Sequence, residues 1–229
     1  MYLYAFFTLC YYLFYTILSS HKKTIGYFPN SSSLVTKEYR IVNVVKASIL
    51  GLFTPASTII LYQCFIPPYD PNIYILNIVG ASYAALDMSA IIYNPYNHIS
   101  TNVHHVLVQF LYAYCYYMDF NMNTLCKPII VYAIFSTYSY MVNYRLSIRF
   151  LNLQYENNIN FLSLFIYIIC CFVNWIIQLY LLLMEVPESF IITKMIYMGL
   201  ILMIINDDIF LMKFLSSINI VSQPVEAIS

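Results

Sequence analysis

The chain has 229 residues, of which 62% are hydrophobic and only 9% are charged, and its 10 basic residues balance its 10 acidic ones. A soluble domain carries about 25% charged residues, so this composition excludes an ordinary soluble enzyme and indicates an integral membrane protein. The zero net charge and the scattered lysines and arginines offer no face for nucleic acid, and no nucleic-acid partner is expected.

Seven apolar segments follow one another along the chain, separated by turn-forming proline and asparagine residues. Most approach the length of about 20 residues that a transmembrane helix needs. The predicted spans are Tyr2–Leu18, Ile41–Ile66, Asn72–Tyr93, Val103–Met118, Pro128–Val142, Phe161–Met184 and Phe190–Leu215. The sequence therefore predicts an all-α fold, a polytopic membrane helix bundle of about seven transmembrane helices.

The first span is predicted to be a signal anchor, because no basic region precedes it and no small-residue cleavage site follows it. Lys22 and Lys23 come directly after it instead. We expect three regions: the anchor helix and its basic loop (1–37), a membrane domain (38–215) and a short cytoplasmic tail (216–229).

Lysine and arginine residues divide unevenly between the two sets of loops, which predicts the orientation. One set holds Lys22, Lys23, Lys37, Arg40, Arg145, Arg149 and Lys213, and the other holds only Lys127 and Lys194. Because positively charged loops stay in the cytoplasm, we expect the N-terminus outside and the C-terminus in the cytoplasm.

This orientation brings polar residues of five spans to the cytoplasmic part of the membrane. Ionisable groups at membrane depth persist by pairing or by lining a wet cavity, and they mark functional sites. We therefore expect one polar cavity open towards the cytoplasm. Its candidate residues are Lys46, Tyr83, Asp87, His104, His105, Asn143, Arg145, Asn206, Asp207 and Asp208.

The adjacent histidines are the strongest candidates for chemistry. Imidazole titrates near neutral pH, so His104 or His105 can act as a general base, a general acid or an acyl carrier. The alternative is a hydrogen bond between helices. Asp87 could orient a histidine ring or pair with Lys46 or Arg145, and Lys46 could instead reach the cytoplasmic surface.

Several chemistries are excluded by what the sequence lacks. Four histidines are too few for a membrane di-iron enzyme, and no G-x-S-x-G elbow or Walker loop occurs. The six cysteines form no C-x-x-C pair, so we interpret them as small apolar residues rather than a metal site or a disulfide framework.

Four fragments in order resemble a known family. They are Tyr83-x-x-x-Asp87, the His104–His105 pair, Asn143-Tyr144-Arg145, and Asn206 with Phe210. In this pattern residues 38–215 are similar to the TLC-domain family, which includes ceramide synthases, translocating-chain-associated proteins and smaller lipid-regulating membrane proteins. The chain departs from the pattern at Lys46, Ser136 and Ile209, where members often have histidine, glutamate and tryptophan, and no His-Asp-x-x-Asp follows His105. It therefore resembles the smaller, lipid-regulating members.

The resemblance implies a protein that acts on membrane lipids or regulates, senses or transfers them. If it is an enzyme, the resemblance implies acyl transfer from acyl-CoA to a lipid amine, with His104, His105 and Asp87 as catalytic residues and Arg145 attracting CoA phosphates. Lys46, Tyr83, Asn143, Asn206 and Asp207 are the expected substrate contacts. It implies no separate cofactor or metal, membrane lipids as partners, a homo-oligomer as one further partner, and an endoplasmic-reticulum-like membrane. The alternatives are a non-catalytic lipid-binding or membrane-chaperone protein and, ranked third, a seven-span receptor or channel.

Overall fold

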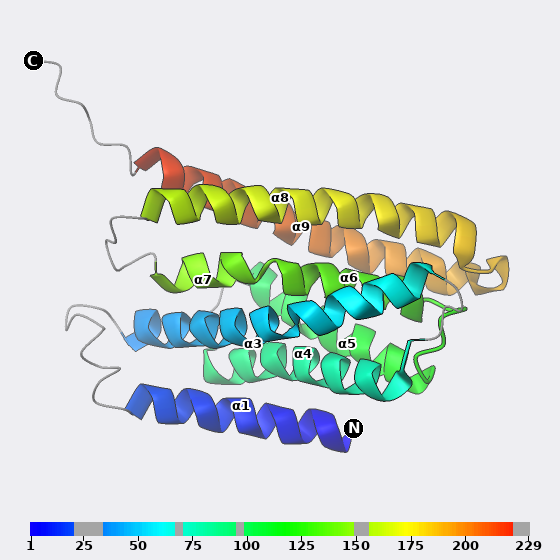
Figure 1. The fold of residues 1–229 in the computed structure, drawn as a ribbon, viewed down its shortest axis with the longest axis horizontal. Helices are drawn as coiled ribbons and strands as arrows, with labels where there is room; N and C mark the ends of the chain where they lie inside the picture. The colour runs from blue at the N-terminus through cyan, green and yellow to red at the C-terminus, as the bar shows by residue number, and fades with distance from the viewer. Residues whose placement is uncertain (21–33, 67–70, 95–98, 149–155, 222–229) are drawn as a thin grey trace, which may run out of the picture.

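The computed structural model describes residues 1–20, 34–66, 71–94, 99–148 and 156–221, and this part of the chain is helical throughout its regular elements. The helices are α1 (Tyr2–Ser20), α3 (Leu34–Phe65), α4 (Ile73–Tyr93), α5 (Ile99–Tyr117), α6 (Cys126–Tyr138), α7 (Tyr140–Ile148), α8 (Glu156–Tyr180) and α9 (Ile191–Val221). A π turn at Leu181–Glu185 and a 3-10 turn at Glu188–Phe190 join the last two. The predicted all-helical bundle of seven rods is confirmed, with α6 and α7 forming one broken rod (Figure 1).

Five of the described helices are long and apolar enough to cross a membrane: α1, α3, α4, α8 with its π turn, and α9. This is the architecture of an integral membrane protein. The predicted fourth and fifth spans, α5 and the α6–α7 rod, do not reach the same length and apolarity. They nevertheless run beside the long helices inside the same bundle (Figure 1).

The rod formed by α6 and α7 differs from the predicted single span because it breaks at Ser139. Hydroxyl groups in this stretch bond to carbonyls of the preceding turn: Thr137 to Ile134 at 2.7 Å and Ser139 to Ser136 at 2.8 Å. Such bonds compete with the helical hydrogen bonds and bend helices. Farther along the chain, α9 continues to Val221 and so runs past the predicted start of the tail at 216.

Six rods form a closed ring in the described chain. Each contacts the next in the order α3, α4, α5, α9, α8 and α6–α7, and the last contacts α3 again. Small residues of α4 permit this close packing, since Ala81, Ala84, Ala85 and Ala90 are all fully buried. Pro55 interrupts the hydrogen-bond ladder of α3, which changes direction near its middle (Figure 1).

Helix α1 packs outside the ring, against α4. Tyr4, Phe7, Tyr11 and Tyr15 recur at helical spacing and make up the face that packs on the ring. The Tyr4 hydroxyl donates to the Gln109 side chain at 2.8 Å, and the Tyr11 hydroxyl bonds to Ser82. The first helix is thereby attached to both α4 and α5.

Successive rods run antiparallel, so their ends gather in two groups (Figure 1). One group, here called the Tyr93 end, holds the ends of α1, α4, α7 and α9 and the starts of α3, α5 and α8. The opposite group is called the Phe65 end. At the Tyr93 end, side chains from the start of α3 bind carbonyls at the C-terminal ends of two other helices. Lys37 donates to the Ser19 carbonyl of α1 at 2.6 Å, and Arg40 donates to the Ser147 carbonyl of α7 at 2.9 Å.

Candidate functional site

A cavity of about 550 Å³ lies inside the ring, in the half of the bundle nearer the Tyr93 end. All six rods of the ring contribute to its wall, whereas the first helix does not reach it. Its polar lining includes Lys46, Tyr83, Asp87, Asn94, His104, His105, Asn143, Tyr167, Asn174, Asp207 and Asp208. Helices that are far apart in the sequence thus bring ionisable groups together in a largely apolar bundle.

One side of the cavity holds a charged network built from three helices. Lys46 of α3 places Nζ 2.6 Å from Oδ1 of Asp87 of α4. His105 of α5 lies between them, with Nε2 3.3 Å from the lysine Nζ and Nδ1 3.1 Å from the same Asp87 oxygen. All three side chains are about nine-tenths buried. Of the two interpretations left open for Lys46, the structure favours pairing with Asp87.

Gln109 fixes the position of this network one turn farther along α5. Its amide donates to the carbonyl of Ala84 on α4 at 3.1 Å and to the carbonyl of His105 at 3.1 Å. The four-residue spacing of His105 and Gln109 on one helix face makes the second contact possible. The histidine backbone is therefore tied to α4 beside the Asp87 carboxylate.

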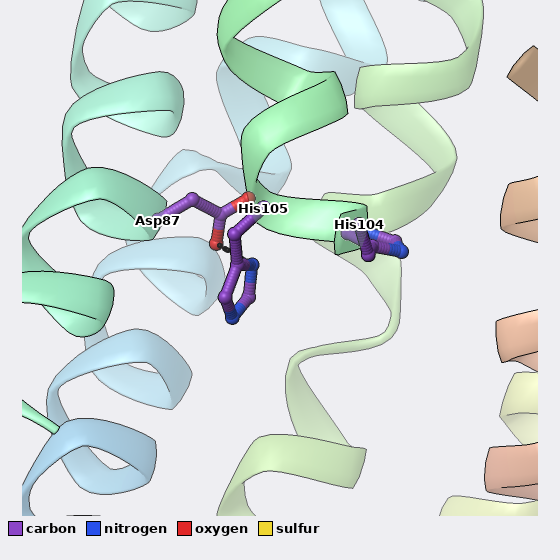
Figure 2. Close-up of side chains that lie close together, drawn as sticks. All are labelled: Asp87, His104 and His105. Carbon is purple, nitrogen blue, oxygen red and sulfur yellow. Dashed lines mark ion pairs between the residues drawn. The ribbon is translucent and has the colours of Figure 1, made fainter. Parts of the chain in front are cut away.

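His104 faces a different partner from its neighbour. Its Nδ1 lies 3.3 Å from Oδ2 of Asp207 on α9. The two imidazole rings are 5.7 Å apart with an interplanar angle of 83°, and Figure 2 shows His104 pointing away from the Asp87–His105 pair. Adjacent helical positions differ by about 100° in direction, which explains why tandem histidines serve two groups of residues.

Asp208 forms a second polar group on α9 that sequence reasoning only partly anticipated. Its Oδ1 accepts the Tyr167 hydroxyl at 2.8 Å, and its Oδ2 accepts the indole N–H of Trp175 at 3.4 Å. Both donors belong to α8. Asp207 and Asp208 both line the cavity, although they are adjacent on α9. Tyr167 and Trp175 are eight residues apart, about two helical turns, so their positions on one side of α8 could have been predicted from the sequence.

Two predicted site residues lie elsewhere. Asn206 has an exposed side chain and does not line the cavity, because α9 turns it away from the face that carries Asp208. Arg145 is fully enclosed, at 0% exposure, and is also absent from the cavity wall. A guanidinium buried in this way does not fit the expected contact with CoA phosphates at the mouth. Asn143 and Tyr83 do line the cavity.

The charges around the cavity are mostly negative. Among the described residues that line it, three carboxylates (Asp87, Asp207 and Asp208) face a single lysine ammonium, that of Lys46. Since two of the nearby basic side chains, Lys37 and Arg40, bind helix carbonyls, they are already engaged at the rim. The wall therefore favours neutral or cationic groups over phosphates.

Among the residues that the structure describes, Asp87, His104 and His105 could hold a metal ion, because their ligand atoms lie within 4.8 Å of one another. Nitrogen and oxygen ligands of these types suit zinc. The Lys46 ammonium is 2.6 Å from the same carboxylate and takes the position of the cation. The geometry favours an ion pair here over a metal centre, and the expectation that no metal is needed stays a prediction.

Comparisons with known proteins identify no family. No family model matches the chain, and neither the curated proteins nor the solved structures contain a match. The class that the fold and the cavity define is thus a helical membrane protein with a buried histidine–aspartate site, and the resemblance to the TLC-domain family stays a prediction.

Proposed function

We propose that this chain is a multi-pass membrane protein that modifies lipids, by transferring an acyl group from acyl-CoA to a lipid amine inside the ring. The observation that carries the proposal is the His104–Asp207 contact at the wall of a 550 Å³ cavity within an apolar bundle. An ionisable pair held at this depth is costly and is a functional candidate by default. The resemblance to ceramide synthases and smaller lipid-regulating proteins supports the choice of substrate.

The two histidines have different roles in this proposal. Both ring nitrogens of His105 lie within 3.3 Å of charged partners, so this ring positions Lys46 and Asp87. His104 has Asp207 beside Nδ1, which leaves Nε2 for a proton of the substrate. A carboxylate on one nitrogen of an imidazole fixes the tautomer and orients the ring for base catalysis on the other.

The reaction then follows as general base catalysis. The amine nitrogen attacks the thioester carbonyl carbon and forms the amide bond, and the carbon–sulfur bond breaks. His104 takes the proton that the amine loses and returns it to the sulfur of the departing CoA thiolate. Asp207 stabilises the imidazolium between these two steps. Positioned general bases of this kind contribute about 10²- to 10⁴-fold to a rate.

The negative wall agrees with a lipid amine as acceptor, because the N–H groups of a neutral amine can donate hydrogen bonds to the carboxylates of Asp207 and Asp208. We place the protein in an endomembrane such as the endoplasmic reticulum, where acyl-CoA reaches the cytoplasmic face, with membrane lipids as partners. The thioester end of acyl-CoA would enter the cavity while its phosphates stay outside.

The test compares lipid profiles of cells that express the wild type, His104→Ala and Asn206→Ala. Cells that express the wild type should differ in lipid profile from cells without the protein. We expect this difference, called the lipid change, to disappear in His104→Ala at unchanged protein level. Asn206→Ala, on the exposed face of the same α9 region, should behave as the wild type. A His104→Ala variant that keeps the full lipid change contradicts the proposal.

A non-catalytic lipid-binding protein is the second candidate, and one observation favours it. Lys46, Asp87 and His105 come from three helices and pair with one another, as expected of a network that holds helices together. In that case His105→Ala and His104→Ala should both lower the amount of folded protein, while the lipid change per folded molecule stays constant.

A further inference from the structure

A second, smaller cavity of about 60 Å³ lies beyond the polar one, towards the Phe65 end. Its wall is almost wholly apolar and includes Leu76, Val79, Gly80, Ile129 and Ala133. Gly80 helps to keep the space open, since a Cβ there would lie 3.4 Å from the ring of Tyr112. We call this cavity the apolar slot.

Two residues, Tyr83 and Tyr132, belong to the walls of both cavities. Tyr83 stands on α4 one turn before Asp87, and Tyr132 stands on α6 with only 5% of its surface exposed. The hydroxyl of Ser136, one turn after Tyr132, lines the polar cavity and donates to the Tyr132 carbonyl at 3.2 Å. The two tyrosine rings form a partition between the polar cavity and the apolar slot.

The partition separates two chemical environments. On one side are the Lys46–Asp87–His105 network and His104, and on the other are aliphatic and aromatic side chains with hardly any polar surface. Leu76 lies seven positions before Tyr83 on α4, so the slot extends about 10 Å beyond the partition. A narrow apolar slot in line with a polar cavity fits a linear hydrocarbon chain.

We propose that Tyr83 and Tyr132 set the maximum length of the hydrocarbon chain that the cavity accepts. This inference rests on the proposed function for the presence of a lipid or acyl substrate. A chain whose head lies near His104 ends at the phenol groups, because the two rings stand between it and the slot. Opening the partition would join the two cavities and let a longer chain enter the slot.

The test measures chain-length preference by binding, independently of any reaction. The full chain in phosphatidylcholine nanodiscs is offered an equimolar mixture of saturated primary amines from butylamine to hexadecylamine, and native mass spectrometry reports which ones are retained. In Tyr83→Ala and Tyr132→Ala the preference should move to longer chains. Each added methylene that enters the slot should improve retention about fourfold relative to the wild type.

Three further variants make the result specific. Ala133→Leu fills the slot, so it should reverse the shift in the Tyr83→Ala background and change nothing by itself. Tyr112→Ala enlarges the slot behind an intact partition and should keep the wild-type preference. Tyr132→Leu keeps an apolar side chain at the partition, but one that is shorter than the phenol. It should give a smaller shift, and it decides the test if the alanine variants of the tyrosines do not fold.

The outcomes separate this inference from the proposed function. An unchanged length preference in the Tyr83 and Tyr132 variants overturns the partition but leaves lipid modification at His104 untouched. A shift caused by Ala133→Leu alone also overturns it, because the chain would already occupy the slot. Retention of no amine by the wild type overturns it as well. A length shift in a protein without lipid-modifying activity supports the partition and contradicts catalysis.

Discussion

Removal of Asp87 should destabilise the bundle far more than removal of its partner Lys46. The two side chains meet at 2.6 Å with 9% and 10% exposure, so each is a buried charge that depends on the other. Breaking a buried pair by removing one member costs about 3–5 kcal/mol, and we expect this for Asp87→Asn, which leaves the ammonium beside the imidazole of His105. His105 lies 3.1 Å from the Asp87 carboxylate and can replace a missing lysine by taking up a proton.

Lys46→Met should accordingly cost only about 1–3 kcal/mol, and less at about pH 5 than at about pH 8, where the imidazole is neutral. The double variant Lys46→Met/Asp87→Leu should recover most of the loss, because replacing a buried pair with apolar residues is often neutral. Equilibrium unfolding in mixed detergent micelles measures these values, with the single tryptophan, Trp175, as fluorescent probe. Equal losses for the two single variants at both pH values would refute the reasoning.

Three further predictions concern separate contacts. Asp207→Asn should lower acyl transfer by about 10²-fold or more in a product assay on purified protein, and a rate equal to that of the control Asn206→Ala would contradict its positioning role. Tyr4→Phe removes one hydrogen bond between α1 and the ring, and the free energy of unfolding should fall by about 1 kcal/mol; no change would show that this bond does not help to hold α1 on the ring. Lys127→Met breaks the pair with Glu185 at the Phe65 end, and it should destabilise the fold while leaving lipid profiles unchanged. A changed lipid profile at normal protein level would link the two ends of the bundle.

The helices were largely predictable because their signals are local. A membrane span is an apolar run of sufficient length, so the ends of α4 were predicted to within one residue at Asn72–Tyr93. The break at Ser139 was not predicted, because it depends on hydroxyl groups that compete for carbonyls within one turn. Likewise, the ring order of the rods results from contacts between distant segments, which no local pattern contains.

The candidate site was predictable in composition but not in pairing. Lys46, Asp87 and His105 were expected at one level of the membrane, and they do line one cavity. This level could be predicted because successive spans alternate in direction, which fixes the position of each residue across the membrane. The direction of each side chain was beyond this reasoning. Asn206 and Arg145 lie at the expected level along the bundle, but the Asn206 side chain points outward and the Arg145 side chain is enclosed outside the cavity. Which side of a helix faces the cavity depends on the helices packed against it, and the sequence of one helix does not contain this information.

The two basic side chains at the start of α3 have a dual role that follows from their contacts. A helix C-terminus carries unsatisfied carbonyls and partial negative charge, and Lys37 and Arg40 neutralise those of α1 and α7. Positive charge in such loops also decides which way a chain enters the bilayer. Charge reversal at either position should consequently have two effects. It should disturb the orientation in which the chain is inserted during synthesis, and it should weaken the packing of the inserted helices.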